Sequence, residues 1–436
     1  MLKVKREKCT FAARLKRLYS NFIKQNKKMK NFQIKISLFL NYFVFAILLN
    51  SVGTLILQVQ NNFGVTETDA SILELCKDFS IAIASFAVSS FFNRLGYKNA
   101  MLLGLAIVTL ACLAMPSLSN FMATKLLCVA VGASFALIKM SVYSTIGLVT
   151  ADEKEHISLM NFIESFFMIG ILSGGFLFAA FIDSNDKTST SWFSAYYVLA
   201  GLSGLAFLLL LTAPLDESSI KANTSKNFSE EFAEMVSLLK NPLVLIFVTC
   251  AFFFVLMEQS IMNWLPTFNN KVLKIPVALS IQMATIMALS VAIGRFLAGI
   301  LGTKINWYVM LSTCLLAAAA LVILVIPMAA NVDASGITSF VDAPKVAFIF
   351  PLIGLFLAPI YPAINSLILS KLPNYKHGVM TSVIIVFSAL GGTLGSRITA
   401  IIFEKLGGQN AFYFSIVPIS ILLISLFFFK KLLAKS

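Results

Sequence analysis

The feature of this sequence that most restricts its fold is a series of long apolar runs. A helix needs about 20 apolar residues to cross the ~30 Å hydrocarbon core of a bilayer, and twelve runs reach that length. They cover approximately residues 36–58, 71–92, 100–117, 121–149, 158–182, 192–214, 243–268, 278–303, 307–329, 345–370, 378–403 and 410–430. Only 12% of the 436 residues are charged, whereas a soluble domain has about a quarter. The sequence therefore predicts an all-α membrane protein with twelve transmembrane helices.

A polar stretch divides these runs into two sets of six. Residues 215–242 form the largest internal gap, which is too short for a soluble domain, and 229–239 within it has the pattern of a short amphipathic helix. We therefore expect two pseudo-symmetric six-helix bundles, 34–214 and 243–430, joined by a cytosolic linker, 215–242, and followed by a short tail, 431–436. Halves of this kind typically enclose a binding site between them.

The distribution of charge predicts the orientation of the helices. Lysines and arginines gather in the turns on one side, whereas Glu67, Asp69, Asp183, Asp333 and Asp342 fall on the other. Because loops rich in lysine and arginine stay in the cytoplasm, both termini are predicted to be cytoplasmic. The expected location is the inner (plasma) membrane of a bacterium.

Residues 1–33 form a basic arm. Residues 1–35 hold twelve lysines or arginines and one acid, Glu7, which gives +11 of the net charge of +14. Directly before a membrane span, such an arm predicts attachment to anionic lipid rather than to nucleic acid. Apolar residues at helical spacing within it favour an interfacial helix. Met29 is an alternative start, which would leave most of this arm out of the protein.

Patterns typical of catalysis or metal binding do not occur in the sequence. The six cysteines are scattered, and the two histidines, His156 and His377, fall in predicted loops. Neither HExxH nor GxSxG is found in a suitable place. We therefore predict no enzymatic activity, no metal site and no cofactor.

The turn after the second run resembles the signature loop of the major facilitator superfamily. That loop reads Gly-x-x-x-Asp-Arg-x-Gly-Arg-Lys, and its Gly and Asp are replaced here. The matching positions, which we predict to act as a conformational loop motif, are Ser89, Asn93, Arg94, Gly96 and Lys98.

A closer similarity is to the fucose/galactose/glucose permease group of proton symporters. It is carried by Leu-Asn-Ser at 49–51, Leu-Gly-Tyr-Lys at 95–98, Asn-Phe-Ile-Glu-Ser-Phe at 161–166, Gly-Arg-Phe at 294–296 and Tyr-Pro-Ala-Ile-Asn-Ser-Leu-Ile-Leu at 361–369. The resemblance covers most of residues 34–430. It implies the twelve-helix fold and the transport of a small solute together with protons.

Two positions depart from that permease group. The group carries one essential carboxylate in the first span and another in the fourth, and the matching positions here are Ser51 and Lys139. An ammonium in the middle of a span costs several kcal/mol unless a partner or a water-filled cavity meets it. We expect Lys139 to join a substrate or coupling site, or else to form a structural salt bridge. Its candidate partners are Glu164 in the next span and Asp78. Ser51 is a candidate residue of the same substrate or coupling site.

Further polar residues inside the runs complete the predicted site. Glu258 is the deep charge of the second half, and the hydrogen-bonding and stacking groups suited to a sugar are Asn50, Asn161, Gln259, Asn263, Trp264, Tyr361 and Asn365. Trp264 is equally typical of an interface anchor. The remaining charges are assigned to the bilayer surface. Glu74 and Lys77 are placed near the outer interface, and Arg295 and Arg397 are expected to snorkel from span ends.

These features favour a monomeric secondary transporter that imports a small polar solute, a sugar or a related and in some cases anionic compound, with protons. An exporter of an amphipathic or anionic metabolite is the alternative within transport. A membrane sensor is the alternative outside transport, but the sequence holds no cytosolic signalling domain to support it.

Overall fold

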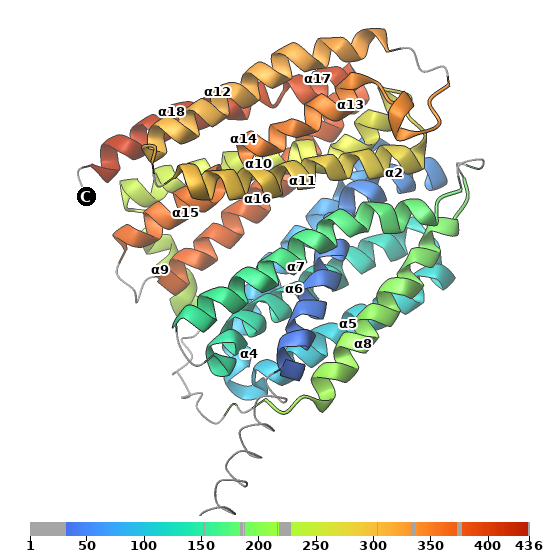
Figure 1. Cartoon of the computed structure of the whole chain (residues 1–436). Coiled ribbons are helices and arrows are strands. Elements are labelled where there is room, and N and C mark those ends of the chain that lie inside the picture. The colour runs from blue at the N-terminus through green and yellow to red at the C-terminus, as the bar shows by residue number, and fades with distance from the viewer. Residues whose placement is uncertain are drawn as a thin grey trace, which may run out of the picture.

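The structure, a computed structural model, describes residues 32–150, 153–183, 186, 188–215, 217, 228–302, 304–332, 336–372 and 377–434. The predicted interfacial helix of the basic arm and most of the linker lie outside these ranges. Throughout the described ranges the regular secondary structure is helical (Figure 1). Eleven described helices are long and apolar enough to cross a membrane. Together with α4 (Ile72–Leu95), they match the twelve predicted runs one for one, and the predicted fold class is confirmed.

The N-terminal bundle begins with a span, Phe32–Asn50, that continues after a turn at Ser51 as α2. Its elements are α2 (Val52–Phe63), α3 (Glu67–Ala70), α4, α5 (Tyr97–Leu118), α6 (Phe121–Val149), α7 (Glu153–Ala180), the 3-10 turn η1 (Ser191–Ser194) and α8 (Ala195–Thr212). The described part of the linker then contains α9 (Phe228–Leu238), so the short helix predicted at 229–239 is confirmed.

The C-terminal bundle repeats the arrangement with six spans. Its elements are α10 (Pro242–Lys271), α11 (Val277–Leu301), α12 (Trp307–Val325), η2 (Ile326–Asn331), η3 (Phe340–Asp342), α13 (Lys345–Ile349), η4 (Phe350–Leu352), α14 (Ile353–Leu357), α15 (Ile360–Lys371), α16 (His377–Leu406), α17 (Gly408–Tyr413) and α18 (Ile416–Leu433). In Figure 1 the two bundles lie side by side, with the N-terminal one blue to green and the C-terminal one yellow to red.

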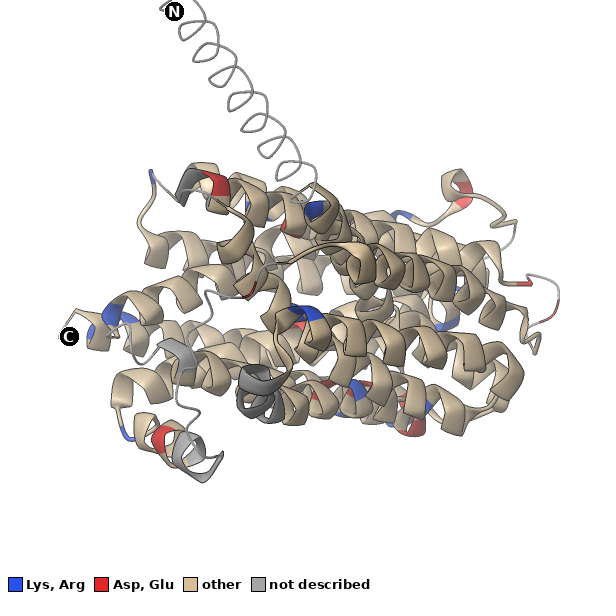
Figure 2. Cartoon of the chain, turned by 90° about the horizontal axis from the view of Figure 1, so that it is seen from below, with Lys and Arg blue, Asp and Glu red and all other residues tan. Residues whose placement is uncertain are grey.

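The surface around the spans is suited to hydrocarbon. Large apolar side chains such as Leu110, Phe296 and Leu324 are exposed. Charged residues are sparse along the ribbons (Figure 2). In a bilayer such side chains meet lipid tails, while the backbone polar groups are satisfied inside each helix.

The molecule has two distinct faces. We call the end that carries α9 and the C-terminal end of the chain the linker face (Figure 1). The loops that follow α2, α7 and α10 lie at the other end, which we call the opposite face. Every span runs between these two faces.

Three pairs of spans join the bundles, through α2 with α10, α4 with α16, and α7 with α11, and the short helix α3 also packs against α16. Glycines allow the close approaches. A Cβ atom at Gly53 would lie 2.7 Å from the carbonyl oxygen of Asn263, and one at Gly175 would collide with the side chain of Thr285. Small residues at such contacts let two helix backbones come together inside a membrane.

The tenth span is the most irregular described span. It consists of α13, η4, α14 and α15 in succession, and Pro351 and Pro359 lie at two of the junctions. Proline lacks the backbone N–H that an uninterrupted helix needs. The second break comes directly before Tyr361, and it sets the direction in which α15 presents that side chain.

Candidate functional site

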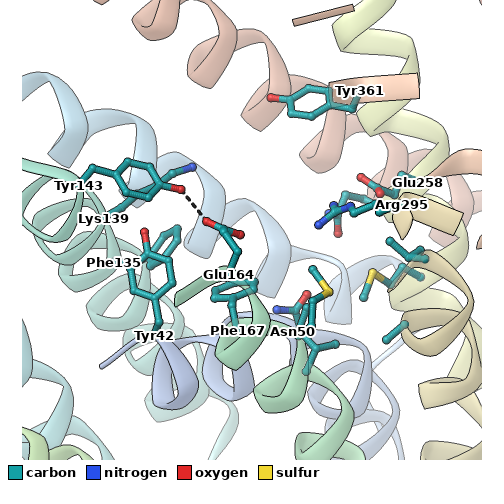
Figure 3. Close-up of a pocket in the computed structure, with 16 residues that line it drawn as sticks. Tyr42, Asn50, Phe135, Lys139, Tyr143, Glu164, Phe167, Glu258, Arg295 and Tyr361 are labelled. Carbon is teal, nitrogen blue, oxygen red and sulfur yellow. Dashed lines mark hydrogen bonds between the residues drawn. The ribbon is translucent and has the colours of Figure 1, made fainter. Parts of the chain in front are cut away.

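A cavity of about 340 Å³ lies between the two bundles. Both bundles line it, and its walls combine charged, aromatic and apolar side chains (Figure 3). The residues on which the argument depends are Tyr42, Asn50, Phe135, Lys139, Tyr143, Glu164, Phe167, Glu258, Gln259, Arg295 and Tyr361. A mixed lining with a few placed polar groups is typical of a site for a small molecule.

The N-terminal bundle supplies one cation and one carboxylate. Phe135, Lys139 and Tyr143 follow one another at four-residue spacing on α6, so they share a face of that helix. The Tyr143 hydroxyl donates to Oε1 of Glu164 on α7 at 2.8 Å. The Lys139 ammonium lies 5.8 Å from the centre of the Phe135 ring.

The expected salt bridge between Lys139 and Glu164 does not form in this structure. Among the described residues, the ion pairs with an N–O distance within 4.0 Å do not include Lys139. Both side chains line the cavity instead. The ammonium therefore has hydrogen-bonding capacity to offer to a solute.

The C-terminal bundle supplies a second pair of opposite charges. Glu258 on α10 and Arg295 on α11 both line the cavity, and Figure 3 shows them next to each other, across from Lys139 and Glu164. The expectation that Arg295 snorkels to the bilayer surface is therefore wrong. Its side chain is exposed because it faces the cavity. With all four groups ionised, these charges sum to zero.

Polar and aromatic groups fill the space between these charges. The Tyr361 hydroxyl is 2.9 Å from that of Ser388, and its ring stacks on Phe254 with centroids 5.6 Å apart. Asn50 donates its amide to the carbonyl of Ala46 at 2.9 Å, which leaves its own carbonyl oxygen for the cavity. Gln259 accepts from Asn263 at 3.0 Å. A hydroxylated solute would find both donors and acceptors here.

Several predicted site residues lie away from the cavity. Trp264 is 0% exposed and donates to Ser396 at 3.1 Å, so it packs inside its own bundle and offers no stacking surface. Ser51 donates to the carbonyl of Leu48 at 2.9 Å. Asn263 packs against Gly53 at the bundle interface. Asn365 lies one helical turn beyond Tyr361 and does not line the cavity. The side chain of Asn161 is outside the described part of the structure.

Asp78 belongs to a separate cluster on α4. Lys77 contacts Glu74 at 2.9 Å and Asp78 at 3.4 Å, so Asp78 is not the partner of Lys139. Glu74 is 0% exposed and Lys77 6% exposed. The expectation that these two residues lie at the outer interface is wrong, because both are buried inside the protein.

Polar contacts between the bundles hold the opposite face closed. Lys271 on α10 donates to Gln60 at 2.7 Å and to Glu67 at 2.5 Å. The amide of Thr68 donates to Glu404 at 3.1 Å. Arg397 on α16 donates to the Thr68 carbonyl and to the Ser71 hydroxyl, so it joins the bundles and does not snorkel as expected. These contacts join the two bundles at the opposite face.

The predicted loop motif contacts the linker. Gly96 has a φ of +74°, a conformation that favours glycine. A Cβ atom there would collide with the carboxylate of Glu217. That carboxylate accepts from the Lys98 amide at 2.7 Å, and the Lys98 ammonium donates to the carbonyl of Ala213 at 2.7 Å. Asn93 and Arg94 end α4, and their side chains are outside the described part of the structure.

Sequence reasoning missed the aromatic wall of the cavity. Phe135 and Tyr143 could have been found from their four-residue spacing around Lys139. Tyr42 and Phe167 gave no such signal, because their helices are apolar on most sides. No group of three or more metal-ligating side chains occurs among the described residues.

Comparison with known proteins identifies the family. The model of the Major Facilitator Superfamily matches residues 37–396. This chain belongs to that superfamily. No curated protein matches the sequence.

Solved structures share the fold of this superfamily member. A D-xylose-proton symporter aligns with a TM-score of 0.70 at 12% identity, over 92% of this chain and 97% of that one. A bacterial homolog of the human lysosomal transporter Spinster, inward-facing and unoccupied, aligns with a TM-score of 0.70 at 13% identity, over 94% and 98%. The transporter FucP in the outward conformation aligns with a TM-score of 0.61 at 17% identity, over 92% and 99%.

Proposed function

We propose that this chain is a secondary active transporter that moves a small polar solute through its central cavity by alternating access, coupled to protons. The observation that carries the proposal is the cavity itself: it lies between two bundles, is lined by two carboxylates and two cations, and polar contacts join the bundles at one face. Alternating access requires a site that each face reaches in turn. Rocking of the bundles about their three joined helix pairs would provide it.

The lining favours a hydroxylated solute that is neutral or carries a single negative charge. Glu164 and Glu258 can accept from hydroxyl groups, while Lys139 and Arg295 can donate to hydroxyl or carboxylate oxygens. The rings of Tyr42 and Phe135 offer apolar faces. We propose a sugar or a related acid as substrate, in keeping with the D-xylose and fucose symporters that share the fold.

The proposal extends to the orientation of the transporter in its membrane and to its oligomeric state. We propose that the linker face is cytoplasmic, because the turns rich in lysine and arginine lie on that side, and that the membrane is a bacterial plasma membrane. The arm would then contact anionic lipid. We further propose that the monomer is the working unit, since one chain contains the complete cavity.

Uptake by reconstituted protein tests this proposal. Proteoliposomes should accumulate one of three labelled probes, D-xylose, L-fucose or D-gluconate, when their interior is alkaline. Lys139→Ala and Glu164→Gln should each lower that uptake by about tenfold or more, because a hydrogen bond to a charged group contributes about 1.5–3 kcal/mol. Asp186→Asn, on the exposed loop of the opposite face, is the matched control. Uptake of a transported probe that is unchanged in both cavity variants would remove this site.

One observation favours the alternative of an exporter. Met168, Ile171 and Met262 give part of the cavity an apolar lining next to two cations, which also suits an amphipathic anion. In that case solute preloaded into vesicles would leave faster when the external solution is acidic, and uptake of the three probes would stay at the level of empty vesicles.

A further inference from the structure

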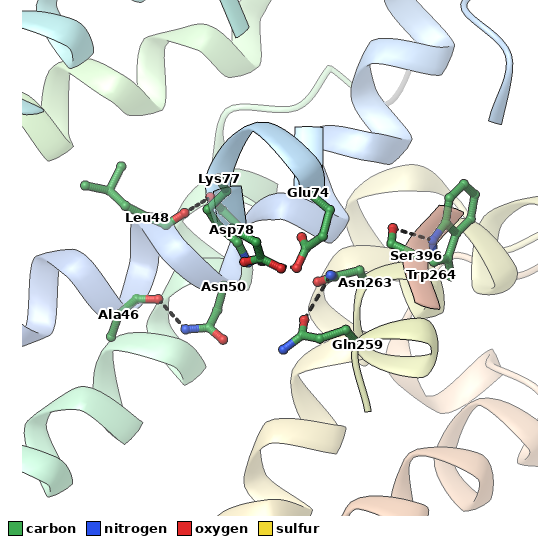
Figure 4. A network of polar contacts seen from close by, with 11 residues as sticks. Ala46, Leu48, Asn50, Glu74, Lys77, Asp78, Gln259, Asn263, Trp264 and Ser396 are labelled. Atoms are coloured by element: carbon green, nitrogen blue, oxygen red, sulfur yellow. Dashed lines mark hydrogen bonds and ion pairs between the residues drawn. The ribbon is translucent and has the colours of Figure 1, made fainter. Parts of the chain in front are cut away.

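The cluster Glu74–Lys77–Asp78 on α4 is unlike the charges of the cavity, because its members contact one another away from water. Glu74 is 0% exposed, Lys77 6% and Asp78 8%. The Lys77 ammonium lies 2.9 Å from Glu74 and 3.4 Å from Asp78. In Figure 4 the two carboxylates point toward each other, next to Gln259 and Asn263 of α10. Two carboxylates and one ammonium leave a net charge of −1 when all three are ionised.

One carboxylate oxygen of this cluster has no donor. Oε2 of Glu74 is fully buried and forms no hydrogen bond. A buried acceptor without a donor costs free energy, and a buried net charge costs more. A proton removes both penalties at once, because it neutralises the excess charge and turns one carboxylate into a donor.

Groups on the neighbouring elements do not supply the missing positive charge. Figure 4 shows the amide side chains of Gln259 and Asn263 of α10 next to the cluster. Arg397 of α16 is engaged by Thr68 and Ser71, and among the described residues it forms no ion pair with the cluster. Two further cations on elements that pack against α4 are engaged elsewhere: Lys98 of α5 donates to the Ala213 carbonyl, and Lys139 of α6 lines the central cavity. The other titratable groups on these elements are Lys125, Cys128 and Tyr143 on α6, Tyr97 and Cys112 on α5, Glu67 and Asp69 on α3, Glu230, Glu231 and Glu234 on α9, and His377, Glu404 and Lys405 on α16. Of these, Lys125 lies over the Phe121 ring and Glu67 pairs with Lys271.

The cluster lies at a contact between the two bundles, so a movement of one bundle relative to the other would change its surroundings. A Cβ atom at Gly392 of α16 would lie 2.7 Å from Oδ2 of Asp78 and 3.3 Å from Cγ of Gln259, so Asp78 packs directly against the other bundle. The contact of α4 with α16 belongs to the three that join the bundles. Gln259 also lines the central cavity, so one side chain separates Asp78 from the solute site.

We infer that Glu74 and Asp78 share one transported proton, with Lys77 as the fixed cation that holds the two carboxylates together. This inference rests on the proposed transport function and names its coupling site. When the opposite face is closed, the cluster is dry and needs the proton. When the bundles separate there, α4 leaves α16, water reaches the carboxylates and the proton can be exchanged. A metal cation fits less well, because the ammonium already contacts both carboxylates and would repel it.

A substrate-free measurement of conformation tests the inference. Spin labels at Thr190→Cys and Val341→Cys report the separation of the bundles at the opposite face, in full-length protein whose native cysteines are replaced by alanine. Val341 is 91% exposed, and Thr190 lies in the exposed loop before η1, so both positions accept a label. Distances are measured by pulsed electron spin resonance in nanodiscs between pH 5 and 9, with Na⁺ held constant.

The closed form should dominate at low pH. If it binds one proton more than the open form, the open-to-closed ratio should rise by up to about tenfold per pH unit through the transition. Asp78→Asn and Glu74→Gln should each remain closed at every pH, because one ammonium and one carboxylate are neutral without a proton. Asp186→Asn should respond like the parent protein.

Three outcomes would overturn the inference. The distance between the spin labels in the parent protein could fail to change with pH, or it could change with Na⁺ at constant pH. Alternatively, Asp78→Asn or Glu74→Gln, if it folds, could show the same pH response as the parent protein. The result is separate from the test of transport. A pH response without uptake of any probe would refute the proposed solute and leave the proton site standing. Uptake driven by a pH gradient in Asp78→Asn would refute the proton site and leave the transporter standing.

Discussion

The central cavity and the α4 cluster contain the same kinds of charged side chain in opposite settings. In the cavity, Lys139 and Glu164 are not within ion-pair distance, and space of about 340 Å³ surrounds them. In the cluster, Lys77 contacts both of its carboxylates, and no residue is more than 8% exposed. The difference teaches that a charge inside a membrane span is explained by its surroundings, not by its depth. A hydrated charge can bind a solute, whereas a dry one must first be neutralised.

The largest expected difference between the two regions comes from Lys77→Met. The substitution leaves two carboxylates buried without a counter-charge, so we expect it to destabilise the protein by about 3–5 kcal/mol. Thermal unfolding in detergent measures the loss. Lys125→Met is the matched control, because the Lys125 ammonium lies over the Phe121 ring at 4.2 Å and such a contact contributes about 0.5–1 kcal/mol. If Lys77→Met and Lys125→Met lost equal stability, the Lys77 cluster would not differ from an ordinary lysine contact.

Gly392→Ala tests whether the cluster packs tightly against the other bundle. The new methyl group would lie 2.7 Å from Asp78, and overpacking of this kind costs about 1–3 kcal/mol. Gly147→Ala, also within a helix but with open space around the new Cβ atom, should be neutral or slightly stabilising. Both are compared by their melting temperatures. If Gly392→Ala melted at the parental temperature, Asp78 would have room to move, and the cluster would not be dry.

Tyr143→Phe removes the hydrogen bond to Glu164. Because the cavity gives that carboxylate access to water, we expect a loss of only about 0.5–1.5 kcal/mol, the range of an ordinary hydrogen bond. Tyr197→Phe, on the exposed side of α8, serves as the reference. A loss as large as that of Lys77→Met would show that Glu164 is buried in the same sense as Glu74.

The smallest effect on stability is expected for Lys139→Met. Among the described residues the ammonium has no ion-pair partner to leave behind, so its replacement should change the free energy of unfolding by no more than about 0.5 kcal/mol. If Lys139→Met unfolds like the parent protein while Lys139→Ala loses uptake, Lys139 acts in binding the solute and not in stabilising the fold. If Lys139→Met were as unstable as Lys77→Met, Lys139 would hold a structural salt bridge after all.

The sequence alone was sufficient for the membrane fold. Twelve apolar runs of span length leave few alternatives to a helical bundle, because every backbone polar group must be satisfied within the bilayer. The polar linker separated the two halves for a similar reason. Lys139, Glu164 and Glu258 could also be predicted as site residues, since a deep charge in an apolar run needs water or a partner, and all three line the cavity.

Only the tertiary structure decided which way each polar side chain faces. Trp264 and Gln259 lie five residues apart on α10, yet the first is buried within its own bundle and the second lines the cavity. Glu74 and Arg295 were assigned to the bilayer surface because each lies near the end of a span, but helix rotation and the packing of one bundle on the other turned both inward. The length and apolarity of a span fix its depth in the membrane. The direction of a side chain depends on the neighbouring helices, which a single run of sequence does not contain.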